Sequence, residues 1–290
     1  MKVGGFTFIR NAVIYDFPIV ESILSILPLV DEYVVLVGKS EDKTLELIQS
    51  IQSSKIKIFS SIWDDSLKKG GQVLARETDK AFKLLSEDID WAFYLQGDEV
   101  IHEKYLPTIH QAMFDYLSVK PVDGLLLKYK HFYGSYDFIG DSRRWYRREI
   151  RVIRRGREIS SYRDAQGFRM KNKKLNVKSI DAWVYHYGWV KPPELQKAKL
   201  NYFPSLYTDE KKVKKSSFDI DSFDYSQIDS LAIFDGEHPK VMEARIDAKN
   251  WNFDFDPTQK NFSFKTKISN WIERYTNYRI GEYKNYILLK

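Results

Sequence analysis

Two acidic side chains follow an apolar segment in the sequence YLQGDEV, where their position suits cation binding. Asp98 and Glu99 come shortly after Tyr94 and Leu95, which are typical of the end of a buried strand. A carboxylate at such a position can hold a hard divalent cation that also contacts the oxygens of a diphosphate. An acidic turn that caps the next helix fits the same spacing, so the pattern alone leaves both interpretations open.

A histidine next to an aromatic strand is the second candidate ligand. His186 lies in the sequence YHYGWVKPPE, and the chain has 5 histidines. A neutral imidazole is a common ligand of divalent metal ions. The alternative is a histidine that packs among Tyr185, Tyr187 and Trp189. We predict that His186 binds a metal ion together with Asp98.

Two carboxylates are candidates for proton transfer. Asp164 lies in SYRDAQGFR and Glu149 lies in RREIR, both inside a basic stretch. A carboxylate can take the proton of a hydroxyl group while its oxygen attacks an electrophilic carbon. Nearby arginines keep a carboxylate ionised, which also makes it a weaker base. The structural alternative for Asp164 is an ion pair with one of these arginines.

The positive charge of the chain is concentrated in one segment. The formal net charge is +6, whereas the segment 143–178 holds 14 Lys and Arg against three acidic residues, which leaves +11 there. Such a patch favours a polyanionic partner, such as phosphates, nucleic acid or an anionic membrane. Alternation along REIRVIRR predicts a solvated face for most of the arginines. Arg144, just before Trp145, is typical of a loop residue that reaches a ligand.

Strand and helix patterns alternate through the first hundred residues. We predict strands at 3–11, 32–38, 55–63 and 90–99, and helices at 18–27, 43–52, 71–85 and 106–117. This alternation indicates parallel βαβ units and a Rossmann-like open sheet, in which ligands bind at the carboxyl ends of the strands. The polar residues that follow the four strands, at 10–11, 38–42, 64–65 and 96–99, are therefore expected to converge on one crevice.

The second half of the chain has a different character. Further strands are predicted at 124–135, 148–156 and 181–191, followed by a helix at 192–203. Beyond residue 206 the sequence is polar and less periodic, and the aromatic and basic tail at 268–290 is predicted to be partly helical. We predict one domain at 1–205 and a C-terminal extension at 206–290 that packs on it.

In this order, the strand-end sequences resemble those of the family 2 glycosyltransferases, which have a GT-A fold. The family's DDGSTDGT-like stretch after the second strand is matched by VGKSEDKT, with Ser40 and Asp42 in register. Its A-R-N-x-G segment in the third helix is matched by LARETD, which contains Arg76. Of its D-x-D motif after the fourth strand, Asp98 remains. The similarity covers roughly residues 3–115 in order.

Two departures from the family pattern concern the nucleotide. Gln96 replaces the first acid of D-x-D, so the ribose contact usually made there must change. Val37 and Gly38 replace the aspartate pair, so the usual carboxylate contact to a uracil ring is missing. This departure argues against UDP as the donor nucleotide, but it does not argue against a nucleotide-sugar donor.

The resemblance implies a fold, a cofactor and a reaction. The implied fold is a mixed, mostly parallel central sheet flanked by helices, of the GT-A (Rossmann-like) kind, with a C-terminal extension. The implied cofactor is a divalent cation, Mn²⁺ or Mg²⁺, held by Asp98 and His186. The residues implied to bind the nucleotide sugar are Arg10, Asn11, Ser40, Asp42, Arg76, Gln96, Gly97, Asp98 and Arg144.

The predicted function is metal-dependent sugar transfer to a hydroxyl group with inversion at the anomeric carbon, of the hexosyltransferase type. The resemblance implies a saccharide or lipid-linked saccharide acceptor and a role in surface polysaccharide or glycolipid synthesis. Asp164 or Glu149 would act as the base. The first alternative is a non-catalytic protein that binds nucleic acid or another polyanion through 143–178. The second is nucleotidyl transfer on the same fold, although the glycines of VGGF lie at the start of the first strand.

Composition limits the class of protein further. The chain has 290 residues, enough to bury a sizeable core, and its 15% aromatic content argues against intrinsic disorder. It has no cysteine, which excludes disulfides and a thiol nucleophile. No apolar run approaches the roughly 20 residues that span a bilayer. Arg10 interrupts the first apolar run, which is unlike a secretory signal. We therefore expect a cytoplasmic protein, with peripheral contact at the inner face of the membrane.

Overall fold

Strands and helices alternate along the first half of the computed structural model, which describes residues 1–64, 66–67, 69–207, 222–276 and 278–290. In chain order, this part contains β1 (Val3–Ile9), α1 (Ile19–Ile26), β2 (Glu32–Gly38), α2 (Thr44–Gln49), β3 (Ile56–Ser61), α3 (Gln72–Lys83), β4 (Trp91–Tyr94), β5 (Glu99–Ile101), α4 (Leu106–Asp115) and β6 (Gly124–Tyr133). The remaining elements are β7 (Ser135–Gly140), β8 (Arg148–Arg154), β9 (Ile159–Tyr162), β10 (Gly167–Met170), β11 (Lys173–Lys174), β12 (Asn176–Trp189), α5 (Pro193–Tyr202), β13 (Leu231–Ile233), α6 (Glu243–Asp247), α7 (Phe264–Thr276) and β14 (Ile287–Leu288).

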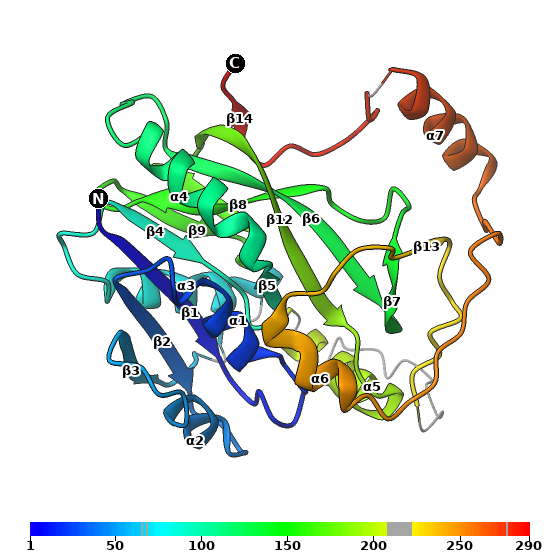
Figure 1. Ribbon diagram of the computed structural model, residues 1–290, viewed down its shortest axis with the longest axis horizontal. Coiled ribbons are helices and arrows are strands. Elements are labelled where there is room, and N and C mark those ends of the chain that lie inside the picture. Colours follow the sequence, from blue (N-terminus) through cyan, green and yellow to red (C-terminus); the bar gives the residue numbers. More distant parts are fainter. Residues whose placement is uncertain (65, 68, 208–221, 277) are drawn as a thin grey trace.

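A mixed central sheet organises the molecule (Figure 1). Its strands follow the order β3-β2-β1-β4-β8-β6, and β12 pairs with β6. β1, β2, β3 and β4 are parallel, whereas β8 runs antiparallel to both β4 and β6. β6 therefore points the same way as β4, and β12 is parallel to β6. This mostly parallel sheet with helices on its faces confirms the fold class that the sequence predicts.

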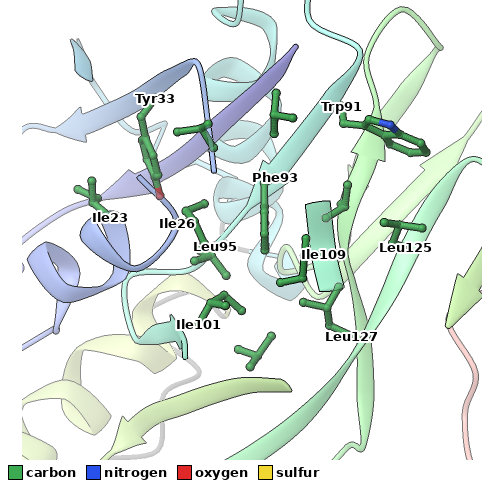
Figure 2. Packing of buried hydrophobic residues seen from close by; sticks show 14 of the residues in the cluster. Ile23, Ile26, Tyr33, Trp91, Phe93, Leu95, Ile101, Ile109, Leu125 and Leu127 are labelled. Atoms are coloured by element: carbon green, nitrogen blue, oxygen red, sulfur yellow. The ribbon is translucent and has the colours of Figure 1, made fainter. Parts of the chain in front are cut away.

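α1, α2 and α4 cover one face of the sheet. Their apolar positions recur at helical spacing, and Ile23, Ile48 and Ile109 are fully buried against the strands. On β2, Tyr33, Val35 and Val37 point toward this face because side chains alternate along a strand. Figure 2 shows α1 residues packed beside strand residues such as Phe93 in this cluster. This core fixes the position of the strand ends from which the candidate site is built.

The opposite face of the sheet is covered by α3 and by the small sheet β9-β10-β11. Val34 and Leu36, the alternate residues of β2, pack here with Phe82 of α3. Phe168 of β10 is fully buried in the same cluster. The small sheet thereby places the loop between β9 and β10 beside the carboxyl ends of the central strands.

The predicted strand over 90–99 is two strands in the structure. β4 ends at Tyr94, and residues 95–98 turn so that β5 can pair antiparallel with β12. Glu99 begins β5 and is completely buried, where it accepts hydrogen bonds from Arg151 and Tyr129. Of these two acidic residues, only Asp98 therefore remains a candidate cation ligand.

The described part of the segment after residue 206 adds two strands to the sheet and packs on it. β13 pairs antiparallel with β7, and β14 pairs parallel with β12. Tyr225 and Leu231 are buried against Tyr133 and Trp145. The division at residue 205 stays a prediction, and residues 208–221 of the extension lie outside the described residues. Among the described residues, no helix is both long and apolar enough to cross a membrane.

Candidate active site

A cavity of about 690 Å³ opens beside the carboxyl ends of β1, β3 and β4. Its other walls come from the loop before β8, from β12 and α5, and from the C-terminal segment. The volume is within the range of small-molecule sites, and the strand-end position is where open α/β sheets bind ligands. Eight predicted site residues line it: Arg10, Gln96, Gly97, Asp98, Arg144, Glu149, Asp164 and His186.

Asp98 is the buried anion of this cavity. Its carboxylate oxygen Oδ2 lies 3.3 Å from Nζ of Lys199 and 3.7 Å from Nε2 of His186. Burial acts against ionisation of Asp98, but the nearby charges of Lys199, His186 and Lys191 outweigh it and lower its pKa to about 2. Asp98 is therefore an anion at any physiological pH, which is the state that binds a cation.

A hydrogen-bonded pair of histidines orients the imidazole that faces Asp98. Nε2 of His131 lies 2.8 Å from the carbonyl oxygen of Tyr146, which can only accept, so this nitrogen carries the proton. Burial lowers the pKa of both imidazoles, so both are neutral and Nδ1 of His131 is an acceptor. Nδ1 of His186, 3.2 Å away, must therefore donate to it. The lone pair of His186 is left on Nε2, the atom nearest Asp98.

The Asp98 and His186 pair fits a divalent cation whose coordination is completed by other ligands. A carboxylate oxygen and an imidazole lone pair face each other with no proton between them, which is an arrangement that a cation stabilises. Gly188 keeps this space open, since a Cβ there would come within 2.6 Å of Oδ2 of Asp98. Within the described residues, no third His, Asp or Glu joins the pair. Two protein ligands plus substrate phosphates and water are common for Mg²⁺.

Two buried lysines that sequence reasoning missed lie beside this pair. Lys199 of α5 donates to the carbonyl oxygen of Gly188 at 3.0 Å as well as contacting Asp98. Lys191 is completely buried and donates to the carbonyl oxygen of Tyr15 at 2.6 Å, and burial lowers its pKa well below the ordinary value. A lysine on a polar helix normally faces solvent, so only the docking of α5 on the sheet reveals that Lys199 contacts Asp98.

Glu149 lies in the cavity wall on β8. Burial raises the pKa of its carboxyl group to about 8, because the effect of burial outweighs the positive charge of Arg151, which lowers this pKa. At neutral pH this side chain is therefore mainly protonated, and it cannot accept a proton in that state. Glu149 lies in the cavity as predicted, but its protonation does not favour it as the base.

Asp164 lies in the loop between β9 and β10, which the small sheet holds at the edge of the cavity. Its Oδ2 accepts a hydrogen bond of 3.1 Å from the hydroxyl group of Tyr207. Its Oδ1 is buried and has no hydrogen-bond partner among the described residues. An oriented carboxylate with one unused oxygen suits an incoming hydroxyl group. Whether Asp164 is the base stays a prediction.

The turn Gln96-Gly97 forms the floor beside Asp98. The backbone carbonyl of Gln96 accepts a hydrogen bond of 3.0 Å from the hydroxyl group of Ser22. A Cβ on Gly97 would come within 2.9 Å of the terminal methyl group of Ile9, so glycine here lets the turn pack closely on this side chain. This packing fixes where Asp98 enters the cavity.

Asn11, Ser40 and Asp42 do not line the cavity. They join the loops after β1 and β2: Oδ1 of Asn11 accepts from the amide of Glu41 at 2.9 Å, and Oγ of Ser40 accepts from the amide of Asn11 at 3.1 Å. Oδ2 of Asp42 accepts from two amides in the β1–α1 loop, at 2.9 and 2.8 Å. The structure thus gives these side chains a role in loop packing, and their contact with a nucleotide stays a prediction.

Arg76 also lies apart from the cavity. It is on α3 and forms an ion pair of 3.1 Å with Asp64, with both side chains about half exposed. Two of the four predicted strand ends, those of β1 and β4, therefore meet in the cavity through their polar residues. The described polar residues that follow β2 and β3 do not line the cavity. Residue 65, which also follows β3, lies outside the described residues.

Many arginines of the basic segment have partners within the protein. Arg151 is 1% exposed and pairs with Glu99, so the expected solvated face is wrong for this residue. Arg154 donates to backbone carbonyls after α4, including that of Leu117 at 2.7 Å, and Arg157 pairs with Asp123. These contacts use the arginines internally, which does not favour a continuous surface for nucleic acid. Arg144 does line the cavity, as predicted.

Aromatic side chains from the segments after β1 and β3 and from α5 line the cavity. Trp63 follows β3, and the guanidinium of Arg10 lies 5.5 Å from the centre of its ring. Tyr15 stacks on Tyr202 with ring centres 4.9 Å apart. Planar rings of this kind suit stacking with a nucleobase. Sequence reasoning missed Trp63 and Tyr15, although aromatic residues close to strand ends are a usable signal.

The C-terminal segment forms part of the cavity wall. Arg279, Glu282 and Tyr283 line it, although they lie far along the chain from the central strands. Arg147 donates to both carboxylate oxygens of Glu282, at 2.8 and 2.7 Å, which fastens the segment to the loop before β8. No local pattern in the sequence indicates this contact.

No known protein-family profile matches the chain, and no curated protein matches it. Several solved structures match part of the chain. The crystal structure of TarS from S. aureus has a TM-score of 0.42 and 16% identity, over 70% of this chain and 39% of that one. TarS 1–349 in complex with UDP-GlcNAc has a TM-score of 0.36 and 19% identity, over 46% of this chain and 36% of that one.

Two further structures are similar. Glucosyl-3-phosphoglycerate synthase from Mycobacterium tuberculosis, in complex with Mg²⁺ and UDP, has a TM-score of 0.31 and 20% identity, over 45% of this chain and 43% of that one. 4-Diphosphocytidyl-2C-methyl-D-erythritolsynthase from Anaerococcus prevotii has a TM-score of 0.38 and 11% identity, over 66% of this chain and 91% of that one. The chain spans 36% of the length of TarS 1–349.

Proposed function

We propose that this protein is a glycosyltransferase that moves a sugar from a nucleotide-sugar donor to a hydroxyl group of an acceptor. The observation that supports it most is the Asp98 carboxylate facing the His186 lone pair at 3.7 Å inside the cavity. Such a pair suits a cation shared with a diphosphate, and basic side chains on the same cavity suit the remaining negative charge.

The donor diphosphate is the group that these side chains would bind. A divalent cation, Mn²⁺ or Mg²⁺, held by Asp98 and His186 would supply positive charge to the leaving diphosphate. Lys199 and Arg144 line the same cavity and add fixed positive charge. Trp63 and Tyr15 offer aromatic surface to the base. The protein would thus stabilise charge that develops as the bond to the sugar breaks.

Proton transfer is the second part of the proposed reaction. Asp164 takes the proton of the acceptor hydroxyl group, and the oxygen attacks the anomeric carbon from the side opposite the diphosphate. The bond between that carbon and the diphosphate breaks in the same step, which inverts the configuration. Oδ1 of Asp164, which has no hydrogen-bond partner in the described part of the chain, supports this role, and the protonated state of Glu149 at neutral pH argues against the alternative base.

We extend the proposal to a hexosyl donor and to a saccharide or lipid-linked saccharide acceptor, in cytoplasmic synthesis of surface polysaccharide or glycolipid. The resemblance of the strand-end motifs to family 2 is the ground for this extension. The alternative of a nucleic-acid binding protein is less well supported, because Arg151, Arg154 and Arg157 are held by internal partners.

Thermal unfolding in the presence of nucleotides tests the proposal. We expect at least one sugar nucleotide among the UDP, GDP, CDP and dTDP series to raise the melting temperature only when Mn²⁺ is present. At a ligand concentration of about 100 times Kd, the gain in unfolding free energy is about 2.7 kcal/mol. Asp98→Ala should abolish the gain, because it removes the anionic ligand of the cation.

Asp88→Ala is the matched control, since Asp88 forms an exposed ion pair with Lys2 and does not line the cavity. This variant should keep the full gain. If no sugar nucleotide changes the melting temperature with or without metal, the proposed function is wrong.

A further inference from the structure

α7 carries an apolar face that points into solvent. Phe264, Ile268, Trp271 and Tyr275 are separated by four, three and four residues, so they lie on one side of the helix. Their exposed fractions are 80%, 46%, 63% and 71%. The ring centres of Trp271 and Tyr275 are 5.2 Å apart, so these two side chains form one continuous surface. We call these four residues the α7 face.

The opposite side of α7 determines which way this face points. Glu273 lies across the helix from the α7 face, since each residue turns the helix by about 100°. Its carboxylate contacts Arg143 at 2.5 Å, Arg147 at 3.2 Å and Arg279 at 3.4 Å. These three arginines hold the polar side of α7 toward the protein. Figure 1 shows α7 at the rim of the molecule, apart from the central sheet.

Basic side chains border the α7 face. Lys265 and Lys267 are both exposed, and helical geometry places them on opposite flanks of the four apolar residues. A helix with aromatic residues on one side and lysines along its edges is typical of segments that lie in a membrane interface. In such segments, the lysines contact anionic headgroups and the aromatic rings enter the boundary of the acyl chains.

We propose that α7 docks through this face on an anionic lipid bilayer, with the helix axis parallel to the membrane plane. Trp and Tyr are favoured at membrane interfaces, where their rings contact apolar chains and their polar groups contact headgroups. A second copy of this chain is a less suitable partner, because a stable protein interface needs about 20 residues on each side. The flanking lysines of two copies would also repel each other.

The docking surface is connected to the cavity. α7 is followed by Arg279, Glu282 and Tyr283, which line the cavity. Docking therefore holds the cavity close to the membrane, where a lipid-linked molecule can enter it. The proposal does not rest on the proposed enzyme activity, and it is tested on the protein without donor or metal.

Cosedimentation with vesicles tests the proposal. We expect the full chain to bind phosphatidylcholine vesicles that contain about 30 mol% phosphatidylserine, more weakly at high salt. The triple variant Phe264→Gln, Trp271→Gln and Tyr275→Gln should lose this binding. These side chains are exposed, so their replacement should leave the melting temperature unchanged.

A matched triple variant controls for the loss of exposed apolar surface. Ile62→Gln, Phe114→Gln and Ile233→Gln replace side chains that are 79%, 60% and 61% exposed elsewhere on the protein. This variant should bind the vesicles as the unchanged chain does. Equal loss of binding in the two triple variants would overturn the proposal, because binding would then not depend on α7.

The lysines provide a second, independent measurement. Lys265→Gln with Lys267→Gln should weaken binding to the anionic vesicles roughly 25-fold, since each lysine near an anionic surface contributes about fivefold. Lys39→Gln with Lys43→Gln makes the same change of net charge on another exposed surface, and should have little effect. If the chain binds no vesicles and light scattering shows a dimer that the aromatic triple variant abolishes, α7 binds a second copy and the proposal is wrong.

Discussion

Glu149 and Asp164 are two carboxyl groups in one cavity whose surroundings give them different chemistry. Burial raises the pKa of Glu149 to about 8, despite the nearby charge of Arg151. Asp164 is held by the hydroxyl group of Tyr207 and keeps one oxygen without a partner among the described residues. A general base must be unprotonated at the working pH. We therefore expect amide substitution of Glu149 and of Asp164 to have different effects on activity.

At pH 7, Asp164→Asn should lower kcat about a thousandfold, because the amide cannot accept a proton. Glu149→Gln should keep most of the activity, because glutamine imitates the protonated acid. The measurement is release of nucleoside diphosphate from the donor identified by thermal unfolding. Both variants should still be stabilised by that donor. Loss of activity in Glu149→Gln together with full activity in Asp164→Asn would assign the base to Glu149.

At the scale of elements, the register between β6 and β12 builds the candidate metal site. His131 of β6 and His186 of β12 are partners across the two parallel strands, which brings their rings together. An irregularity in the pairing follows between His186 and Trp189, and Gly188 lies within it. The two strands thus supply the candidate ligand His186 and, in His131, the group that fixes which nitrogen of His186 carries the proton.

His131→Phe should weaken Mn²⁺ binding in the presence of nucleoside diphosphate by about 10- to 100-fold, which is usual for loss of a hydrogen bond to a metal-binding histidine. Phenylalanine keeps an aromatic ring but removes the acceptor for Nδ1 of His186. Electron paramagnetic resonance of free Mn²⁺ measures the affinity without any catalysis.

His110→Phe is the control, because His110 is an exposed histidine of α4. It should leave Mn²⁺ affinity unchanged. Unchanged affinity in His131→Phe, with the fold intact, would show that His131 does not orient a metal ligand.

At the scale of the whole molecule, the buried Glu149 links folding stability to pH. In the unfolded chain a glutamic acid ionises near pH 4.5, whereas in the folded protein Glu149 stays protonated up to about pH 8. Between these values the folded state binds more protons, so its stability falls as the pH rises, by at most about 1.4 kcal/mol per pH unit. Above pH 8 both states are ionised, and this loss does not grow further.

Glu149→Gln should remove this pH dependence. The unfolding free energy of the variant minus that of the unchanged protein should therefore increase from pH 5 to pH 8 and then level off. Urea unfolding over this range measures it. Glu158→Gln, at an exposed ion pair with Lys171, should show no such trend. A difference that stays constant from pH 5 to pH 8 would contradict the raised pKa.

Local sequence patterns and the family resemblance were sufficient to predict the fold class and the two central residues of the candidate site, Asp98 and His186. The alternation of apolar strands with amphipathic helices predicts the parallel half of the sheet, because burial on both faces and helical periodicity are visible in short windows. Asp98 was predicted because a polar residue that follows a buried strand lies near the sheet edge where ligands bind. His186 was predicted because imidazole is a common metal ligand and because the family resemblance implies one there, and it lies within β12. The structure confirms that they lie together in one cavity.

Contacts between distant segments lay beyond those patterns. Lys199, Tyr207 and Glu282 reach the cavity from a polar helix and from segments far along the chain. Likewise, the pKa of Glu149 depends on what surrounds it, and the internal pairing of Arg151 depends on where Glu99 is buried. Short-range periodicity records which side of an element is buried. Packing between elements decides which charged groups meet, and how far each is removed from water.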